Sequence, residues 1–132
     1  MKLIKSSQQL VETALDKIRT LPYEEAIKQR PNHDVLFVDI RDIRELEREG
    51  TIPNALHAPR GMLEFWVDPE SPYFKSVFSE KEHYILFCQS GWRSALATAT
   101  LQDMGMDNIS HIEGGFKNWK KSGGAIASIK SA

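Results

Sequence analysis

Two apolar runs constrain the fold of this chain more than any other feature. The segments DVLFVDI, residues 34–40, and HYILFC, residues 83–88, are almost wholly apolar and do not alternate with polar residues. An unbroken apolar run of this length is typical of a strand that is buried on both faces. Such strands occur in parallel sheets that are covered by helices on either side. The sequence therefore predicts an α/β fold.

Helical and extended patterns alternate along the rest of the chain. Apolar residues recur at helical spacing near the N-terminus, which predicts an amphipathic helix within residues 1–17. Further helices are expected in PYEEAIKQR, RDIRELEREG, WRSALATATLQDMG and GFKNWKKSGG, and further strands in ALHA and NISHIEG. This alternation predicts a parallel sheet with helices on both faces. We expect an N-terminal helix over residues 1–17, one α/β domain over residues 18–126 and a tail over residues 127–132.

Composition and charge give no support for several classes of partner. The 132 residues carry 17 basic and 18 acidic side chains, for a formal net charge of −1. This balance offers no electrostatic attraction to nucleic acid or to an anionic membrane. No segment approaches the roughly 20 apolar residues of a membrane-spanning helix. The only cysteine cannot form an internal disulfide, so no oxidising compartment is implied. We expect a cytoplasmic protein, and its oligomeric state stays open.

The only cysteine, Cys88, stands at the carboxyl end of the second apolar run, where parallel sheets bind ligands. The residues that follow it, QSGWRS, lead directly into a predicted helix. Unpaired N–H groups and the helix dipole favour an anion at such a position, and the same field favours a thiolate over a thiol. Gly91 suits a sharp turn, and the Arg93 guanidinium can bind an anionic substrate. The sequence thus predicts a nucleophile, although a thiol at the end of an apolar strand is also typical of an inert core.

The histidines do not suggest a metal site. They show no spacing typical of metal ligands, either with one another or with Cys88. The four residues are His33, His57, His83 and His111. No Cys–His pair can be argued from the sequence, so the loop itself has to activate the cysteine.

Four ordered motifs resemble those of the single-domain rhodaneses, a family of sulfurtransferases. CQSGWRS, residues 88–94, matches the active-site loop of that family, Cys–x–x–Gly–x–Arg–Ser/Ala. FVDIRDIRELEREGTIPNALHAP, PRGMLEF and EGGFKNWKKSG resemble three further motifs, and together the four extend over roughly residues 34–124, which is most of the chain. Thr51 stands where the family usually has His, and Asn54 where it usually has Gly. Because Asn tolerates a left-handed backbone nearly as well as Gly does, we expect that turn to be kept.

The resemblance implies a three-layer α/β/α fold around a mainly parallel sheet of about five strands. It also implies a reaction in which Cys88 attacks the outer sulfur of a donor such as thiosulfate, sulfite leaves, and a persulfide forms on the cysteine. A thiophilic acceptor, cyanide or a thiol, then removes that sulfur. A protein acceptor is a further candidate partner. The resemblance implies no metal and no organic cofactor.

Roles follow for the residues around the cysteine. Cys88 is expected to be the nucleophile and the persulfide carrier, and Ser94 a hydrogen-bond donor beside it. Main-chain N–H groups of the loop are expected to bind the donor, and they belong to Gln89, Ser90, Gly91, Trp92 and Arg93. Asp39 and Arg41 follow the first apolar strand and are expected to support the site as a structural ion pair.

Two other functions stay open at this point. Tyrosine and dual-specificity phosphatases use Cys–x5–Arg, whereas four residues separate Cys88 from Arg93. The shorter loop makes a smaller cradle, which suits a sulfur atom better than a phosphate group, so a phosphatase or arsenate reductase is the weaker alternative. The other alternative is a non-enzymatic module in which Cys88 relays sulfur to a protein partner or senses oxidation.

Overall fold

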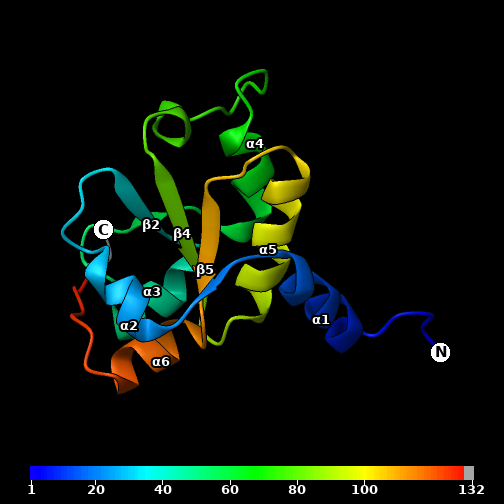
Figure 1. Ribbon diagram of the computed structural model, residues 1–132, viewed down its shortest axis with the longest axis horizontal. Coiled ribbons are helices and arrows are strands. Elements are labelled where there is room, and N and C mark those ends of the chain that lie inside the picture. The colour runs from blue at the N-terminus through cyan, green and yellow to red at the C-terminus, as the bar shows by residue number, and fades with distance from the viewer. Residues whose placement is uncertain (130–132) are drawn as a thin grey trace.

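A sheet of five parallel strands forms the centre of the computed structural model, which describes residues 1–129 (Figure 1). The strands are β1 Thr20–Leu21, β2 Val35–Asp39, β3 Leu56–His57, β4 His83–Phe87 and β5 Ile109–Ile112. They lie in the order β1-β5-β4-β2-β3, and every pair is parallel. The two apolar runs of the sequence, β2 and β4, are therefore neighbours in the interior of the sheet. The predicted five-stranded parallel α/β fold is confirmed.

Helices connect the strands. They are α1 Ser7–Lys17, α2 Tyr23–Lys28, α3 Ile43–Glu49, α4 Leu63–Val67, α5 Trp92–Asp103 and α6 Gly115–Lys121, with short 3-10 turns at Arg60–Met62 and Ser76–Ser79. Two helices begin with a capping box, in which the side chain of each of two residues accepts a hydrogen bond from the main-chain N–H of the other. Ser6 and Gln9 form one at α1, and Asp42 and Glu45 form the other at α3.

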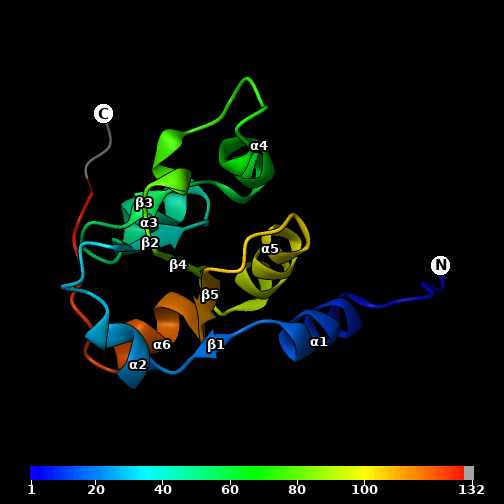
Figure 2. The same cartoon turned by 45° about the horizontal axis from the view of Figure 1, so that its top comes forward.

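The β4 side chains explain why the apolar runs do not alternate in polarity. Leu86 and Cys88 belong to the apolar cluster that β4 forms with α4 and α5 on one face of the sheet. Ile85 and Phe87 belong to the cluster that it forms with α2 and α6 on the other face. Figure 2 shows these helices on opposite sides of the sheet. Both faces of β4 are thus buried, as expected for a central parallel strand.

The N-terminal helix α1 lies outside α5 rather than directly on the sheet. Ala14 of α1 packs against Ala95 and Ala99 of α5. Ala97, on the other side of α5, packs in the cluster next to the sheet. Because alanine side chains are small, α5 can approach the sheet and α1 closely at the same time, and α1 leads directly to the edge strand β1 (Figure 2).

The C-terminal segment returns to the domain after α6. Ala127 forms an isolated antiparallel bridge with Thr51, in which each N–H donates to the other residue's carbonyl oxygen. Residues 130–132, the end of the predicted tail, lie outside the described residues. Among residues 1–129, no helix has the length and apolar character that a membrane crossing requires.

Candidate active site

Cys88 directly follows β4 at the carboxyl end of the sheet, with its side chain on the α5 face. The residue is 1% exposed, so its sulfur lies at the bottom of the loop rather than on the surface. Two main-chain N–H groups donate to this sulfur, from Gly91 at 3.2 Å and from Ser94 at 3.3 Å. A wholly inert core thiol needs no such donors, whereas a thiolate is stabilised by them.

The shape of the loop follows from Gly91 and the helix behind it. Gly91 has a φ of 103°, which a side chain rarely permits, and it turns the chain sharply into α5. The first N–H groups of a helix have no partner within the helix. Ser94 is in the first turn of α5, and its N–H donates to the sulfur of Cys88 instead. The positive end of the helix dipole therefore faces the sulfur.

The start of α6 fixes the other side of the loop. The N–H groups of Phe116 and Lys117 donate to the carbonyl oxygens of Cys88 and Gln89, at 2.8 Å and 3.0 Å. Gly115 makes this approach possible, because a Cβ there would lie 2.5 Å from the carbonyl oxygen of Cys88. Close contact with the cysteine loop thus explains the second glycine of the pair, whereas a Cβ on Gly114 would meet the side chain of Asn118.

Asp39 and Arg41 form a buried network beneath the loop. Both residues are 0% exposed, and the guanidinium of Arg41 donates to the two carboxylate oxygens of Asp39 at 3.0 Å and 2.9 Å. Arg41 also donates to the side-chain oxygen of Gln89 at 2.9 Å and to the carbonyl of Gly50 at 2.7 Å. Thr51, at the position where the resembled family usually has His, donates to Asp39 at 2.7 Å. The network joins β2 and the α3 C-terminus to the loop through buried, fully paired groups.

The structure places the other predicted binding residues in different settings. Among the described residues, only Gly91 and Ser94 donate a main-chain bond to the sulfur. The Gln89 side chain is held by Arg41, while Ser90 is exposed and Trp92 is 71% exposed at the rim of the loop. The amides of Gln89, Ser90, Trp92 and Arg93 stay predicted donors to a bound substrate.

Arg93 is occupied by a carboxylate. Its guanidinium donates to both oxygens of Glu45 on α3, at 2.8 Å and 3.0 Å. This pairing raises the pKa of Arg93, which the electrostatic influence of Cys88 also favours, and it lowers the pKa of Glu45. An anionic substrate that binds Arg93 has to compete with Glu45.

His111, on β5, is a site residue that the sequence did not indicate. Its Nδ1 lies 2.9 Å from the hydroxyl oxygen of Ser94, which in turn lies 3.6 Å from the sulfur of Cys88. The residue is 2% exposed, and burial lowers its pKa to about 4. The one available signal was the pair of polar residues, Ser110 and His111, between two isoleucines of the predicted strand. His111 pairs with Leu86 across the sheet.

Grooves flank the cysteine loop on two sides. One, of about 780 Å³, is lined by Glu49, Gln89, Ser90, Lys117, Lys120 and Lys121. The other, of about 630 Å³, lies between α1 and the start of α5 and includes Trp92 and Arg93. The first groove carries more positive than negative side chains next to the loop, which favours the approach of an anion.

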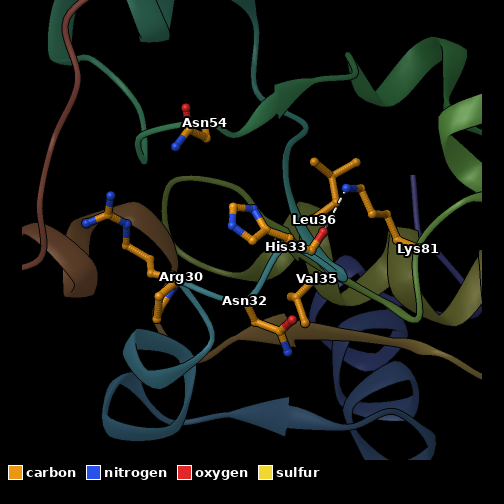
Figure 3. A pocket seen from close by; sticks show the side chains of 8 residues that line it. Arg30, Asn32, His33, Val35, Leu36, Asn54 and Lys81 are labelled. Carbon is orange, nitrogen blue, oxygen red and sulfur yellow. Dashed lines mark hydrogen bonds between the residues drawn. The ribbon is translucent and has the colours of Figure 1, made fainter.

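A separate pocket of about 420 Å³ lies at the opposite end of the sheet, where β2 begins (Figure 3). Arg30, Asn32, His33, Asn54 and Lys81 supply its polar lining, and Lys81 donates to the carbonyl oxygen of His33 at 2.8 Å. None of the predicted site residues lines it. Within residues 1–129, no group of three or more His, Cys, Asp and Glu side chains is placed to hold a metal ion.

Comparison with known proteins identifies relatives over most of the chain. The family model of the rhodanese-like domain matches residues 23–122. A sulfurtransferase of Allochromatium vinosum is 32% identical over 101 residues, which cover 75% of this chain and 86% of that protein. The human thiosulfate:glutathione sulfurtransferase is 33% identical over 87 residues, which cover 61% of this chain and 75% of that protein.

A solved structure from Rhodopseudomonas palustris CGA009 is similar over nearly the whole chain. It is 44% identical, with a TM-score of 0.92, and the match covers 96% of this chain and 98% of the other. That protein is described as one of unknown function and a possible tyrosine phosphatase. The similarity includes the N-terminal part of this chain, which the matched family model leaves out.

Proposed function

Because the chain belongs to the family of rhodanese-like domains, and its relatives include sulfurtransferases, we propose that it transfers sulfane sulfur through a persulfide on Cys88. The observation that supports this proposal most is the pair of N–H groups, from Gly91 and Ser94, that donate to the sulfur. Donors in this position stabilise negative charge on a thiolate, and on a persulfide whose outer sulfur enters the same loop.

The proposed reaction has two steps. The thiolate of Cys88 attacks the outer sulfur of thiosulfate, the bond between the two donor sulfurs breaks, and sulfite leaves with the electron pair. In the second step, cyanide or a thiolate attacks the outer sulfur of the persulfide, and the Cys88 thiolate is the leaving group. The acceptor departs as thiocyanate or as a new persulfide, so the enzyme alternates between two covalent states.

The charge around the loop is compatible with anionic donors and acceptors. Lys117, Lys120 and Lys121 line one groove beside the loop, and the α5 dipole points its positive end at the sulfur. Thiosulfate, cyanide and low-molecular-weight thiols are therefore suitable probes. A protein that carries a thiol or a persulfide is a further proposed partner.

Intact mass spectrometry after incubation with thiosulfate tests the proposal. We expect the chain to gain the mass of one sulfur atom, and cyanide to remove it with release of thiocyanate. Cys88→Ser is the control, because its hydroxyl can accept the same N–H bonds but cannot form a persulfide. A wild-type chain that gains no sulfur from thiosulfate, from a low-molecular-weight persulfide or from a protein persulfide would contradict the proposal.

The choice of donor separates an enzyme from a dedicated relay. Turnover with thiosulfate and cyanide supports an enzyme, while loading only from a protein persulfide supports a relay. The description of the Rhodopseudomonas structure gives a specific reason to test a phosphatase as the second candidate. Saturable, Cys88-dependent hydrolysis of an aryl phosphate would favour it, and the four-residue spacing to Arg93 leads us to expect none.

A further inference from the structure

A row of four side chains in polar contact leads from the sulfur of Cys88 to the edge of the sheet. The hydroxyl oxygen of Ser94 lies 3.6 Å from this sulfur and 2.9 Å from His111 Nδ1. The other ring nitrogen of His111, Nε2, lies 3.0 Å from the hydroxyl oxygen of Thr20. Cys88, Ser94 and His111 are at most 2% exposed, whereas Thr20 is half-buried on the edge strand β1.

The hydrogens of these four residues allow two directions for the bond between Ser94 and His111, and the Ser94 hydroxyl also lies 3.3 Å from the carbonyl oxygen of Gly91. A serine hydroxyl has one hydrogen to donate, and a neutral imidazole donates from one nitrogen and accepts at the other. If His111 carries its hydrogen on Nδ1, it donates to Ser94, and the Ser94 hydrogen is free to point at the sulfur. If the hydrogen is on Nε2, Ser94 donates to Nδ1 and can only accept at the sulfur. The Thr20 hydroxyl can serve either tautomer, because it both donates and accepts.

We propose that His111 is a positioning residue whose tautomer sets the direction of the Ser94 hydroxyl relative to the sulfur of Cys88. The Nδ1–H tautomer makes Ser94 a donor to the thiolate and to the persulfide. The Nε2–H tautomer makes Ser94 an acceptor from the thiol. This inference rests on the proposed function, since it concerns the ionised sulfur that begins the reaction.

The same four side chains offer a route by which the proton of the thiol can reach solvent. The S–H proton of Cys88 passes to Ser94, the Ser94 proton to His111 Nδ1, the Nε2 proton to Thr20, and the Thr20 proton to solvent. One proton leaves the sulfur and one reaches water, with no change of oxidation state. Afterwards Ser94 donates to the thiolate, His111 donates to Ser94, and Thr20 donates to Nε2. After ionisation, these hydrogen bonds therefore point toward the sulfur, which is the direction that stabilises the thiolate.

His111 relays the proton as a ring that is neutral before and after the transfer, and it does not store the proton as an imidazolium. Its buried position lowers its pKa to about 4, so the imidazolium is scarcely populated at neutral pH. The charged groups around the loop include Arg93 of α5, its partner Glu45 of α3, the Asp39–Arg41 pair at the end of β2, and Glu49, which lies 3.8 Å from Arg41. These groups are the same in all the variants below, so a change in the ionisation of the thiol reports on the contacts between Ser94, His111 and Thr20.

The rate of alkylation of Cys88 as a function of pH tests the inference without any sulfur donor. In His111→Leu, the Ser94 hydroxyl no longer receives a hydrogen bond from Nδ1, so it is free to turn from the sulfur to the carbonyl oxygen of Gly91, 3.3 Å away. We expect the midpoint of the alkylation profile to rise by about one pH unit, which makes alkylation roughly tenfold slower below the midpoint. His111→Asn should restore most of the rate, because its amide can donate to Ser94 from the place of Nδ1.

A matched control lies on the same sheet. His83 of β4 contacts the hydroxyl of Ser110 on β5 at 2.8 Å, but this pair is at the start of β4, away from the loop. His83→Leu should leave the alkylation midpoint unchanged. An equal shift in His83→Leu and His111→Leu would overturn the inference, as would a His111→Leu profile that matches the wild type.

Nitrogen NMR of the wild-type ring keeps the inference testable even if His111→Leu fails to fold. We expect His111 to change from the Nε2–H to the Nδ1–H tautomer over the same pH range in which Cys88 ionises. A single tautomer across that range would overturn the inference. Neither readout involves sulfur transfer, so a failure here differs from a failure of the proposed function, which would appear as the absence of a persulfide.

Discussion

At the scale of single residues, Arg93 is held by a carboxylate rather than left open for a substrate. Glu45 receives both of its N–H bonds, and the pair is partly exposed, with 43% of the Arg93 side chain accessible. In Glu45→Gln, the guanidinium loses its charged partner, and the glutamine can still complete the capping box of α3. We expect the KM for thiosulfate to fall several-fold with little change in kcat, because the donor no longer competes with a carboxylate.

The size of the accompanying stability change helps to interpret that variant. Partly exposed ion pairs contribute about 1 kcal/mol or less, so denaturant unfolding should barely distinguish Glu45→Gln from the wild type. Asp103→Asn is a suitable control, because it breaks the exposed Lys17–Asp103 pair between α1 and the C-terminal end of α5. If steady-state kinetics give the same KM for Glu45→Gln and the wild type, Arg93 does not bind the donor.

Sequence patterns predicted local features that involve close neighbours in the chain. They predicted the loop after Cys88 with its turn at Gly91, three residues on, and the buried pair of Asp39 and Arg41, which are two residues apart. They did not predict the partners Glu45 of Arg93 and His111 of Ser94, which are 48 and 17 residues apart in the chain. Such pairs depend on how α3, α5 and β5 pack, and no local pattern records that packing.

At the scale of elements, the start of α6 shapes the cysteine loop from outside. Its first N–H groups donate to the carbonyls of Cys88 and Gln89, so those peptide groups keep their orientation. The apolar strands and the helix periodicities predicted that α6 exists, but they gave no sign that it contacts the loop. The one signal in the sequence was Gly115 itself, because a glycine can mark a close approach of two backbones.

Gly115→Ala tests this contact. The new Cβ would lie within 2.8 Å of three backbone atoms of Cys88 and Gln89, and Gly115 has a φ of 63°. Because backbone atoms cannot move aside without displacing the loop, we expect a loss of roughly 3 kcal/mol or more in the free energy of unfolding. We also expect slower persulfide formation by the chains that remain folded, measured by mass spectrometry after a short incubation with thiosulfate.

Gly123→Ala is the matched control for this substitution. Gly123 follows the other end of α6 and also has a positive φ, 91°, but its Cβ would meet nothing within 4 Å. The backbone strain alone should cost about 1–2 kcal/mol and leave persulfide formation unchanged. Equal effects of the two substitutions would show that strain, and not contact with the loop, accounts for the role of Gly115.

At the scale of the whole molecule, the sheet encloses polar groups that bind its layers together. His111 bridges α5 to the edge strand β1 through Ser94 and Thr20, and it has to be neutral to remain buried. The unfolded chain has no such restriction, because an exposed histidine has a pKa of about 6.5. Burial lowers the pKa of His111 to about 4 in the folded protein. Between these two values the unfolded state binds more protons than the folded state.

The free energy of unfolding should therefore fall with acidification through this window. The contribution of His111 is complete above about pH 6.5, decreases as the pH falls, and is lost near pH 4, for a total of roughly 3 kcal/mol. Urea titrations at pH 7.5, 6 and 5 should show this loss in the wild type and a smaller one in His111→Asn, which has no titrating ring. Burial also lowers the pKa of His83, so His83→Asn measures its share of the same slope. A slope equally steep in His111→Asn and the wild type would mean that His111 is hydrated and titrates normally, which is incompatible with the buried contacts that place it between Ser94 and Thr20.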